Sequence, residues 1–577
     1  MRILDSRRLT GPNLLLDGPG ALLDVAVEDP EPAIAAWRDA LASLLDAVGW
    51  ARAATVARAN RHGASLAFAA DLDVLYAATE VNEAAWAMAS RALGAPDHGS
   101  DEPFTATVAR LREAIDEERK PWLLELAGQA SRRGVTLLAD DRRVSVGLGT
   151  GSRAWPAAET PYVMDRIPWG ELHDVPAALV TGTNGKTTTV RLLGEIAEAA
   201  GKTAGVTSTD RVTVGPDVVA EGDYSGPNGA RTVLRDRRVE VAMLEVARGG
   251  ILRRGLALPR AQAALVTNVA NDHLGEFGIF DLASLADVKL VVAKTVGSEG
   301  RVVLNADDPL LLERGARLPH RVIWFSLDAE HPALAAHLTR GGEACVLAGE
   351  TLMLLRGRER AAIASVAEVP MTFGGAARHN VANALGAIGV ATALGFSVEV
   401  VRSGLLAFQT TAAANPGRGN LWTLGGATAI VDFAHNPHGL AALSDLAASL
   451  PARRRSIVIG QAGDRDDEAI REFARAAWAT CPDRVFLKEM EIFLRGRERG
   501  AVPAILEAEL RRLGAPEAAF VRCESELEAV RAALEWAREG DLLILTTHAQ
   551  RDQVIGLLEG LRKVGWKPGE PVAEPTT

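Results

Sequence analysis

Short apolar runs that alternate with amphipathic helical patterns fill the chain from about residue 161 to residue 405. The first run, residues 175–180, leads into a polar loop that contains two glycines, and Val190, Leu193 and Ile196 follow at helical spacing. Further apolar runs of strand length lie at residues 241–245, 264–268 and 301–304. Because helices between such strands cover both faces of a parallel sheet, the pattern predicts an α/β, doubly wound, mainly parallel sheet.

A second unit of the same kind is predicted after residues 415–419, whose sequence Asn-Pro-Gly-Arg-Gly is typical of a domain boundary. Its strand-like runs lie at residues 428–433, 456–460, 484–487 and 542–546. The start of the chain differs, because an early extended segment is followed by long helical patterns, which predict an α+β domain. We therefore expect an N-terminal domain at 1–110, a linker at 111–165, a central domain at 166–413 and a Rossmann-like C-terminal domain at 414–577.

The composition is that of a globular protein with several domains. The chain has 577 residues and 48% hydrophobic content, which is enough for roughly three or four cores. Its net charge of −11 argues against nucleic acid or an anionic membrane surface as the main partner, because both attract basic surfaces. We expect small-molecule ligands instead, and any anionic ligand must be held by a local group of basic residues.

Cysteine usage and the N-terminal sequence predict a cytoplasmic protein. Only Cys345, Cys481 and Cys523 occur, and their wide spacing matches neither a metal-binding pattern nor a disulfide framework. The first residues lack the apolar core of a signal peptide, and no apolar run reaches the roughly 18 residues that a membrane helix needs. These features predict no export signal and no membrane span.

The polar loop at residues 181–189, Thr-Gly-Thr-Asn-Gly-Lys-Thr-Thr-Thr, is the strongest chemical signal in the chain. Its glycines let the backbone approach an anion, the first N–H groups of the following helix point at a phosphate, and Lys186 adds a positive charge. Thr187 or Thr188 can then bind Mg²⁺. The general phosphate-loop pattern has four residues between its glycines, whereas this loop has two. We interpret it as a phosphate-binding loop of a shortened type.

Charged and imidazole groups follow two of the apolar runs. Glu245 ends one run and is followed by Arg248, and His273 lies just after the next run. Ligands of open α/β sheets bind beyond the carboxyl ends of the strands. Glu245 can hold Mg²⁺, Arg248 can bind a carboxylate or a phosphate, and His273 supplies an imidazole. Beside a phosphate loop, we interpret all three as functional rather than as solvated loop residues.

Two later positions are open to a structural and a functional interpretation. Lys289 lies in the helical stretch at residues 282–296. It is either a helix residue with a solvated tip, or a group that contacts substrate or is converted to a carbamate. Asn380 lies at the start of a helix, where it can either cap the helix or bind the edge of an adenine through its amide.

The predicted C-terminal domain has polar and basic side chains at its strand ends, where a ligand can reach them. In an acidic protein, a local group of basic residues is suited to an anionic substrate. The candidate residues are Asp432, His435, Asp464, Arg465, Lys488, Arg495 and Arg497.

These motifs, in this order, resemble the Mur ligase superfamily, which includes the muramyl-peptide ligases, folylpolyglutamate synthase and the ligase half of cyanophycin synthetase. The shortened phosphate loop is the form found in this superfamily. The matching pieces are residues 182–188, Glu245, residues 268–274, Lys289, residues 305–309, residues 378–383, Arg418 and residues 432–437. Within the superfamily, the most similar group is cyanophycin synthetase, on residues 222–227, 244–256, 463–468 and 494–497.

The resemblance implies ATP-dependent formation of an amide or isopeptide bond, with ATP and Mg²⁺ as cofactors. Lys186 would stabilise the transferring phosphoryl group, and Thr187, Glu245 and His273 would hold Mg²⁺. Lys289, as a carbamate, would bridge a second Mg²⁺. The residues that would bind ATP are Thr183, Asn184, Gly185, Lys186, Thr187, Thr188, Asn380, Arg418 and Asp432.

The resemblance also implies small-molecule amino-acid or peptide substrates, and a homodimer or higher homo-oligomer. The residues that would surround the substrates are Tyr224, Ser225, Asn228, Arg248, His435, Asp464, Arg465, Lys488, Arg495 and Arg497.

The chain departs from cyanophycin synthetase in one large respect. That family carries an ATP-grasp ligase between its N-terminal domain and its Mur ligase part, whereas only residues 111–160 occupy this space here. A remnant of that size cannot hold an ATP-grasp site, so aspartate polymerisation is not expected.

Two other functions compete with a ligase. One is a catalytically inactive nucleotide- or polymer-binding partner subunit of a larger synthetase, which the presence of the phosphate loop, Glu245 and His273 disfavours. The other is a folylpolyglutamate-like ligase, which the N-terminal extension disfavours.

Overall fold

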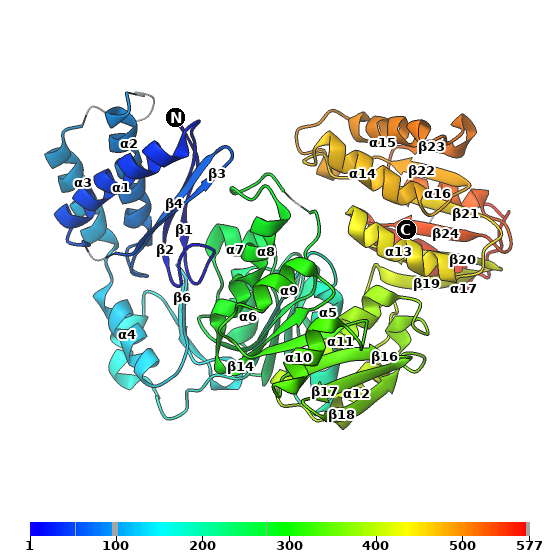
Figure 1. The fold of residues 1–577 in the computed structure, drawn as a ribbon, viewed down its shortest axis with the longest axis horizontal. Coiled ribbons are helices and arrows are strands. Elements are labelled where there is room, and N and C mark those ends of the chain that lie inside the picture. The colour runs from blue at the N-terminus through cyan, green and yellow to red at the C-terminus, as the bar shows by residue number, and fades with distance from the viewer. Residues whose placement is uncertain (52, 95–101, 273, 573–577) are drawn as a thin grey trace.

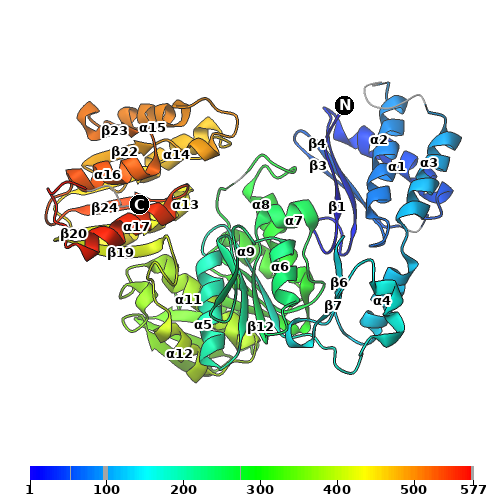
Figure 2. The same ribbon diagram turned by 180° about the vertical axis from the view of Figure 1, so that it is seen from behind.

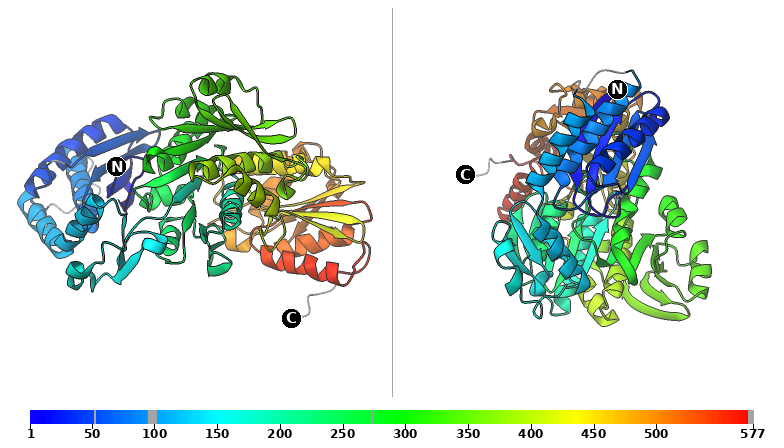
Figure 3. Two further views of the ribbon diagram at one scale, coloured as in Figure 1. Left: turned by 90° about the horizontal axis from the view of Figure 1, so that it is seen from below. Right: turned by 90° about the vertical axis from the view of Figure 1, so that its left-hand side faces the viewer.

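The computed structural model describes residues 1–51, 53–94, 102–272 and 274–572. Within these ranges the chain forms three main units, each of helices packed on a sheet, that follow one another along the long axis of the molecule (Figures 1 and 3). The central unit lies between the N-terminal and the C-terminal units, and a small subdomain joins the first unit to the second (Figure 2).

The N-terminal unit is an antiparallel sheet with helices packed on one face. The strands, in the order β1-β2-β4-β3, are β1 (Arg2–Leu9), β2 (Gly20–Ala26), β3 (Thr55–Asn60) and β4 (Gly63–Ala69). The helices are α1 (Pro30–Ala47), α2 (Leu75–Ala92) and α3 (Phe104–Glu118). Trp37, Phe68 and Trp86 fill the core, and Val108 and Leu111 of α3 join it. The helix α3 therefore runs across the expected boundary at residue 110, because its apolar stripe belongs to this core.

The linker is a folded subdomain of one helix and one small antiparallel sheet. It comprises α4 (Pro121–Arg132), β5 (Leu137–Ala139), β6 (Arg143–Val146) and β7 (Arg153–Pro156). Arg235 of the central unit attaches to it, since its Nη1 donates to Asp140 at 2.5 Å and its Nε donates to Ser145 at 3.1 Å.

The central unit is built on one long sheet, mostly parallel and antiparallel only at its two edges. The strand order is β11-β10-β9-β12-β8-β13-β14-β15-β16-β17-β18. Their bounds are β8 (Ala177–Thr181), β9 (Ala204–Thr207), β10 (Arg211–Val214), β11 (Asp217–Glu221), β12 (Val241–Glu245), β13 (Ala261–Val266), β14 (Val296–Asn305), β15 (Val322–Ser326), β16 (Glu343–Ala348), β17 (Thr351–Arg356) and β18 (Glu359–Ser365).

Helices cover both faces of this sheet, as the sequence predicts. One face packs against α5 (Lys186–Ala199), α11 (Arg378–Ala393) and α12 (Val398–Ala407). The other face packs against α6 (Pro227–Leu234), α7 (Arg248–Arg254), α8 (Leu282–Leu290), α9 (Pro309–Gly315) and α10 (Pro332–Thr339). The strands β8, β12 and β13 are buried from end to end apart from Gln262, which explains why they are apolar throughout.

The C-terminal unit is a second sheet of the same kind, parallel except for β19. Its strand order is β19-β20-β24-β21-β22-β23. The strands are β19 (Arg418–Leu424), β20 (Ala427–Asp432), β21 (Arg455–Ile459), β22 (Arg484–Lys488), β23 (Phe520–Cys523) and β24 (Leu542–Thr546). The helices are α13 (Pro437–Ser449), α14 (Asp467–Trp478), α15 (Ala501–Arg512), α16 (Glu526–Trp536) and α17 (Arg551–Lys563).

The cysteines and the helices bear on two expectations from the sequence. Cys345, Cys481 and Cys523 are all unpaired thiols, in agreement with the expected absence of a disulfide framework. None of the helices in the described ranges combines the length and the apolar character that crossing a bilayer requires.

Candidate functional site

A cleft of about 1140 Å³ lies between the central and C-terminal units. The central unit contributes the loop between β8 and α5, the residues that follow β12, β13 and β14, and the start of α11. The C-terminal unit contributes residues that follow β20, β21, β22 and β24. The cleft therefore collects the carboxyl ends of parallel strands from two sheets, the place where α/β folds bind ligands.

The phosphate loop joins β8 to α5 and depends on its glycines. Gly182 and Gly185 have positive φ angles of 144° and 87°. A Cβ at Gly182 would lie 1.8 Å from Thr267 Oγ1, and a Cβ at Gly185 would lie 2.2 Å from Asn383 Oδ1. Only glycine satisfies both the backbone conformation and the lack of space. The loop is thus pressed against the neighbouring β13 and α11.

Lys186 is the first residue of α5 and faces this loop. Its Nζ donates to the carbonyl oxygens of Gly182 at 3.0 Å and Thr183 at 2.8 Å. Burial lowers the pKa of Lys186, and the nearby Glu245 carboxylate opposes that shift. A cation held at the carbonyl side of a phosphate loop can turn toward an incoming phosphate, which it would bind more strongly than two carbonyls.

Glu245 lies at the end of β12 with 2% of its surface exposed. Thr187 Oγ1 donates to its Oε2 at 2.8 Å, and Thr209 Oγ1 donates to its Oε1 at 2.7 Å. Thr188 points elsewhere, since its hydroxyl accepts from Asn415 Nδ2 at 3.4 Å. Of the two threonines that the sequence leaves open as magnesium ligands, Thr187 is therefore the one beside the carboxylate.

Lys289 lines the cleft from α8 and is 3% exposed. Burial lowers its pKa well below the usual value for lysine, and the positive charge of Lys186 lowers it further. Within the described ranges, its Nζ has no hydrogen-bond or ion-pair partner. The solvated-tip interpretation of Lys289 is thus wrong, and a buried amine facing the cleft replaces it. His273, which the resemblance implies as a ligand of Mg²⁺, falls outside the described residues.

Arg418 and Asp432 are opposite one another in the β19–β20 pair. Arg418 lies over the ring of Phe433 at 4.6 Å, and its Nη2 is 3.5 Å from Thr187 Oγ1 in the central unit. Burial raises the pKa of Asp432 to about 6, although Arg418 opposes the shift. The C-terminal unit thus places a guanidinium beside the phosphate loop.

Comparison with known proteins identifies the family. The model described as the Mur ligase middle domain matches residues 180–391, and the model described as the Mur ligase, glutamate ligase domain matches residues 417–548. A UDP-N-acetylmuramoyl-L-alanyl-D-glutamate–2,6-diaminopimelate ligase of Chlorobaculum tepidum is 30% identical over 63% of this chain and 70% of its own length. The chain belongs to the Mur ligase family.

Another relative of the chain is a cyanophycin synthetase of Synechocystis, whose sequence is 38% identical to it over 72% of the chain. The match covers 47% of that enzyme, so the chain spans about half the length of the curated relatives it matches first. The structure of E. coli FolC in complex with ADP aligns with 67% of this chain and 90% of its own, at 21% identity and a TM-score of 0.49.

The Mur ligase cleft brings together most, but not all, of the predicted substrate residues. Ser225, Arg248, His435, Asp464, Arg465 and Arg495 line it. Arg465 Nη2 donates to Asp272 Oδ1 at 2.7 Å, and His435 Nε2 lies 3.6 Å from Asp272 Oδ2. Because Asp272 belongs to the central unit, these contacts join the two walls of the cleft.

Four of the predicted substrate residues lie outside the cleft lining: Tyr224, Asn228, Lys488 and Arg497. Tyr224 packs partly buried against the apolar core of the central unit. Asn228 lies on α6, where its Oδ1 accepts from Arg231 Nη1 at 3.4 Å. Arg497 donates to the carbonyl oxygens of Gly463 and Arg465 at 2.8 and 2.6 Å, so it supports the loop that carries Arg465.

Lys488 was expected among the cations that bind substrate, and the structure contradicts this expectation. Its side chain is fully buried. The Nζ donates to Glu526 Oε2 at 2.6 Å, to Thr546 O at 2.6 Å and to His548 Nδ1 at 2.9 Å. A lysine whose three N–H groups are all used inside a domain has none left for a ligand.

Asn380 lines the cleft, and its amide is already engaged. Its Nδ2 donates to Met371 O at 2.8 Å and its Oδ1 accepts from Asn383 Nδ2 at 3.2 Å. The alternative role as a helix cap is not what is seen, since α11 begins after Ala377 without a side-chain capping bond in the part of the chain described here. Asn380 instead joins the turn before α11 to the wall of the cleft.

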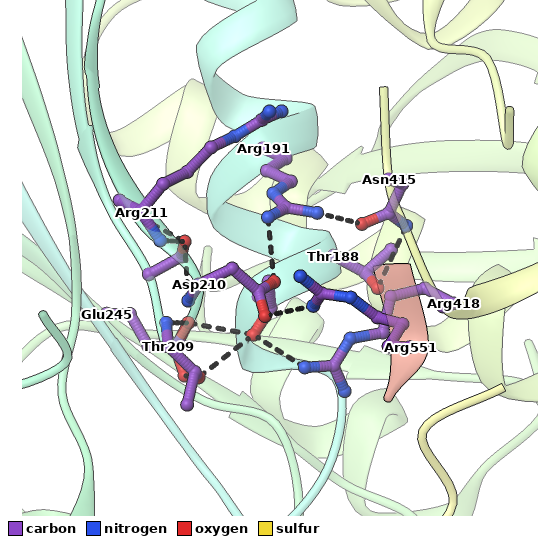
Figure 4. A network of polar contacts seen from close by, with 12 residues as sticks. Thr188, Arg191, Thr209, Asp210, Arg211, Glu245, Asn415, Arg418 and Arg551 are labelled. Carbon is purple, nitrogen blue, oxygen red and sulfur yellow. Dashed lines mark hydrogen bonds and ion pairs between the residues drawn. The ribbon is translucent and has the colours of Figure 1, made fainter. Parts of the chain in front are cut away.

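A network beside the phosphate loop was missed by the sequence reasoning (Figure 4). Asp210 Oδ2 accepts from Arg191 Nη2 of α5 at 2.8 Å, and Asp210 Oδ1 pairs with Arg551 Nη1 of α17 at 2.5 Å. Arg191 Nη1 also donates to Asn415 Oδ1 at 2.9 Å. Burial lowers the pKa of Arg191 to about 10. These residues are far apart in the chain and lie in no recognisable motif, so no local signal could have found them.

Proposed function

We propose that this chain is an ATP-dependent ligase that joins a carboxylate to an amine on amino-acid or peptide-like substrates. The observation that carries the proposal is the pairing of Thr187 with the buried Glu245 beside Lys186, in a cleft that a second α/β domain faces. Membership of the Mur ligase family supports it. The arginines of the cleft suit acidic substrates, because a guanidinium binds a carboxylate with two parallel hydrogen bonds.

The reaction would proceed in two steps. In the first, a substrate carboxylate oxygen attacks the γ-phosphorus of ATP, the bond from that phosphorus to the β,γ-bridging oxygen breaks, and ADP leaves. In the second, the amine nitrogen attacks the acyl carbon of the acyl phosphate, the bond from carbon to the phosphate oxygen breaks, and the nitrogen loses a proton. Lys186 and the N–H groups of the loop would stabilise the negative charge on the transferring phosphoryl group.

The residues beside the loop fit a Mg²⁺ ion. Glu245 is a buried carboxylate whose recorded partners are two hydroxyls and one N–H, with no ion pair among the described residues. A buried carboxylate without a cationic partner is costly, and hard oxygen ligands are those that Mg²⁺ prefers. Thr187 and Glu245 would hold the ion, with His273 as the sequence predicts. When bound, the ion supplies neutralising charge to the phosphates.

Lys289 would act as a carbamate. Its buried amine faces the cleft, and burial lowers its pKa well below the usual value for lysine, which favours the neutral form that can attack CO₂. The nitrogen forms a bond to the carbon of CO₂, one C=O π bond opens to leave its electron pair on oxygen, and the nitrogen loses a proton to water, so the buried amine becomes a carboxylate-like anion. Such an anion would be favoured by Lys186 nearby and could help to hold a second Mg²⁺.

The nucleotide would span both domains. The loop residues from Thr183 to Thr188 would bind the phosphates, Asn380 would lie near the adenine, and Arg418 and Asp432 would contact the nucleotide from the C-terminal domain. Closure of one domain over the other would then bring the reacting groups into line.

The function is tested by measuring phosphate release from ATP across a matrix of carboxylates and amines. The matrix includes arginine, lysine, aspartate and β-aspartyl dipeptides. We expect at least one pair to stimulate release and to yield an amide product detectable by mass spectrometry. If ATP binds but no pair raises turnover above background, the ligase proposal fails and the binding-subunit alternative is favoured.

The same assay tests Lys186. Lys186→Met is expected to lower kcat by about 100-fold or more, because one charged donor to the transferring group is lost. Lys202→Met, which removes an exposed lysine just beyond the end of α5, is the matched control and should behave like the wild type. Retained activity in Lys186→Met with an unchanged melting temperature would remove the loop lysine from the mechanism.

A further inference from the structure

The wall of the cleft that lies toward the N-terminal domain carries a charged pair. Arg248, at the start of α7, pairs with Glu276, which lies in the loop before α8. Both residues line the cleft. Arg248 is one of the arginines that line the cleft, and the sequence predicts that it binds a carboxylate or a phosphate, so the position of this pair matters for substrate binding.

The loop that carries Glu276 is a tight turn that rests on the N-terminal domain. Gly275 N donates to Ile279 O at 2.8 Å and Ile279 N donates to Glu276 O at 3.1 Å. Between them, Phe277 has a φ of 54°, an uncommon left-handed conformation for a non-glycine residue. A conformation of this kind persists where surrounding contacts hold it.

The aromatic side chains of this loop supply those contacts. The guanidinium of Arg7, on β1 of the N-terminal domain, lies 4.9 Å from the centre of the Phe277 ring. The Phe280 ring packs against His62 at 4.7 Å and against the Arg61 guanidinium at 4.6 Å. Two rings of one short loop are therefore docked on cationic and aromatic side chains of another domain, where each guanidinium is attracted to the negative face of a ring.

Arg7 also holds the helix that carries Arg248. It is 6% exposed, and its Nε donates to the carbonyl oxygen of Leu252 in α7 at 2.8 Å. Its Nη1 donates to Asp24 Oδ2 at 2.6 Å and to Asp5 Oδ2 at 2.7 Å, within its own domain. One buried guanidinium thus touches α7, the Phe277 ring and the N-terminal sheet at the same time.

The backbone next to Arg7 strengthens this docking. Thr10 N donates to Arg254 O at 2.7 Å, and Leu256 N donates to Pro12 O at 2.8 Å. A Cβ at Gly11 would lie 2.2 Å from Leu256 O, so only glycine allows the segment around residue 11 to come this close to the segment around residue 256. Figures 1 and 2 show β1 beside α7 from opposite sides. The segment that follows β1 therefore lies along the segment that ends α7.

We propose that the N-terminal domain is a platform that positions Arg248, through its pair with Glu276, for binding the acidic group of the substrate, and that Arg7 is the central positioning residue of this platform. The inference rests on the proposed ligase function for what the pair binds. How the N-terminal domain holds the pair does not depend on the ligase function. An experiment on the ligand-free protein can therefore test the docking separately from the ligase proposal.

The first test follows hydrogen–deuterium exchange in the ligand-free protein, which needs no substrate. Arg7→Met should raise the exchange rates of residues 274–281 and 248–256 by about tenfold or more, while residues 181–189 of the phosphate loop keep wild-type rates. The matched control is Arg8→Met. Arg8 lies next to Arg7 on β1, but its recorded partners are Asp141 and the Tyr76 ring, both remote from the cleft.

A second variant guards against misfolding, because Arg7→Met leaves Asp24 buried without its cation. Phe277→Leu removes the ring from the loop side and leaves the N-terminal domain intact. It should also raise exchange at 274–281, and Arg7→Lys should fall between Arg7→Met and the wild type. Wild-type exchange of 274–281 in both Arg7→Met and Phe277→Leu would overturn the proposal. So would a change in Arg7→Met that is confined to the N-terminal domain, with Phe277→Leu unaffected.

The second test uses kinetics with any substrate pair that the ligase assay identifies. Arg7→Met and Phe277→Leu should raise the KM of the acidic substrate about tenfold and leave the KM of ATP unchanged, because the phosphate loop lies elsewhere in the cleft. Equal effects on both KM values, or on kcat alone, would contradict a positioning role. If no substrate pair is found, the exchange experiment still decides the platform, while the ligase proposal fails separately.

Discussion

At the scale of single residues, the two groups in the cleft with the clearest chemical consequences are Lys289 and Asp432. Both were singled out from the sequence, but only the structure shows how far they are buried. In each case burial disfavours the charged form, so the amine of Lys289 and the carboxyl of Asp432 both tend toward neutrality. The amine is charged at low pH and the carboxyl at high pH, so the two groups change activity and stability in different pH ranges and can be tested separately.

Lys289 is expected to make activity depend on CO₂. Burial lowers the pKa of the amine and so favours its neutral form, and protonation as the pH falls removes the form that reacts with CO₂. Turnover should therefore drop in CO₂-free buffer, more steeply at lower pH, and recover with bicarbonate. NMR of protein equilibrated with ¹³C-bicarbonate should show a carbamate signal that Lys289→Met lacks. Turnover that is independent of CO₂, with no such signal, would exclude the carbamate.

Asp432 is expected to limit the stability of the ligand-free protein at higher pH. Its folded-state pKa of about 6 lies above the usual 3.8, so the folded state binds the proton more tightly than the unfolded state. The stabilising contribution is complete below about pH 4 and is lost as the pH rises through 6. The shift of roughly two units corresponds to at most about 3 kcal/mol.

The variant Asp432→Asn tests this linkage. It should raise the melting temperature relative to the wild type at pH 8 and raise it clearly less at pH 4.5, while weakening nucleotide binding at both. A melting-temperature difference that stays constant between these pH values would show that Asp432 does not titrate in this range.

At the scale of elements, the sequence predicted the apolar strands β8, β12, β13 and β14 of the central sheet, the strands β20, β21, β22 and β24 of the C-terminal sheet, and the strand ends that carry chemistry. The runs before Thr181 and Glu245 are central parallel strands, buried on both faces, and such strands can only be apolar. The sequence-based prediction is wrong where the burial of a residue depends on a partner far away in the chain. Lys488 ends an apolar strand and looks like a cation at a strand end, but Glu526 on α16 and His548 lie beside it and enclose it. The helix α3 similarly extends across the expected boundary at residue 110, because its buried residues pack in the N-terminal core.

The same distinction applies to the site. A phosphate loop has a local signature, since its glycines and lysine are set by the turn that they form. The bridge of Arg191, Asp210 and Arg551 has none, because a charged side chain on a helix or loop has the same appearance in a sequence whether it meets solvent or a partner 341 positions away. The predicted set therefore contained the residues of motifs, among them Arg465 and His435, which meet Asp272 across the cleft, and it missed Arg191, Asp210 and Arg551, which lie in no motif.

At the scale of the whole molecule, Asp210 and Arg551 join the central and C-terminal domains next to the phosphate loop (Figure 4). The pair is mostly buried, with side chains 10% and 17% exposed. Arg551→Met should reduce the population of the arrangement in which both domains face the nucleotide. We expect the KM of ATP to rise up to about tenfold, which corresponds to about 1.4 kcal/mol, with a small change in melting temperature.

Arg562→Met is the matched control for this prediction. Arg562 lies on the same helix and pairs with Glu559 on the exposed surface, where an ion pair contributes little. A double-mutant cycle with Asp210→Asn isolates the coupling between the two domains. Equal KM values for ATP in Arg551→Met and Arg562→Met would show that the Asp210–Arg551 pair does not hold the domains together.

The sequence by itself determined the doubly wound sheets, the phosphate loop and the order of the family's motifs, because each of these depends on residues close together in the chain. Only the tertiary structure decided which of those residues share the cleft. It placed Thr187 rather than Thr188 beside Glu245, enclosed Lys488, and set the N-terminal domain against the Arg248–Glu276 pair. These outcomes depend on which faces of distant elements meet, and packing between domains has no periodicity that a sequence displays.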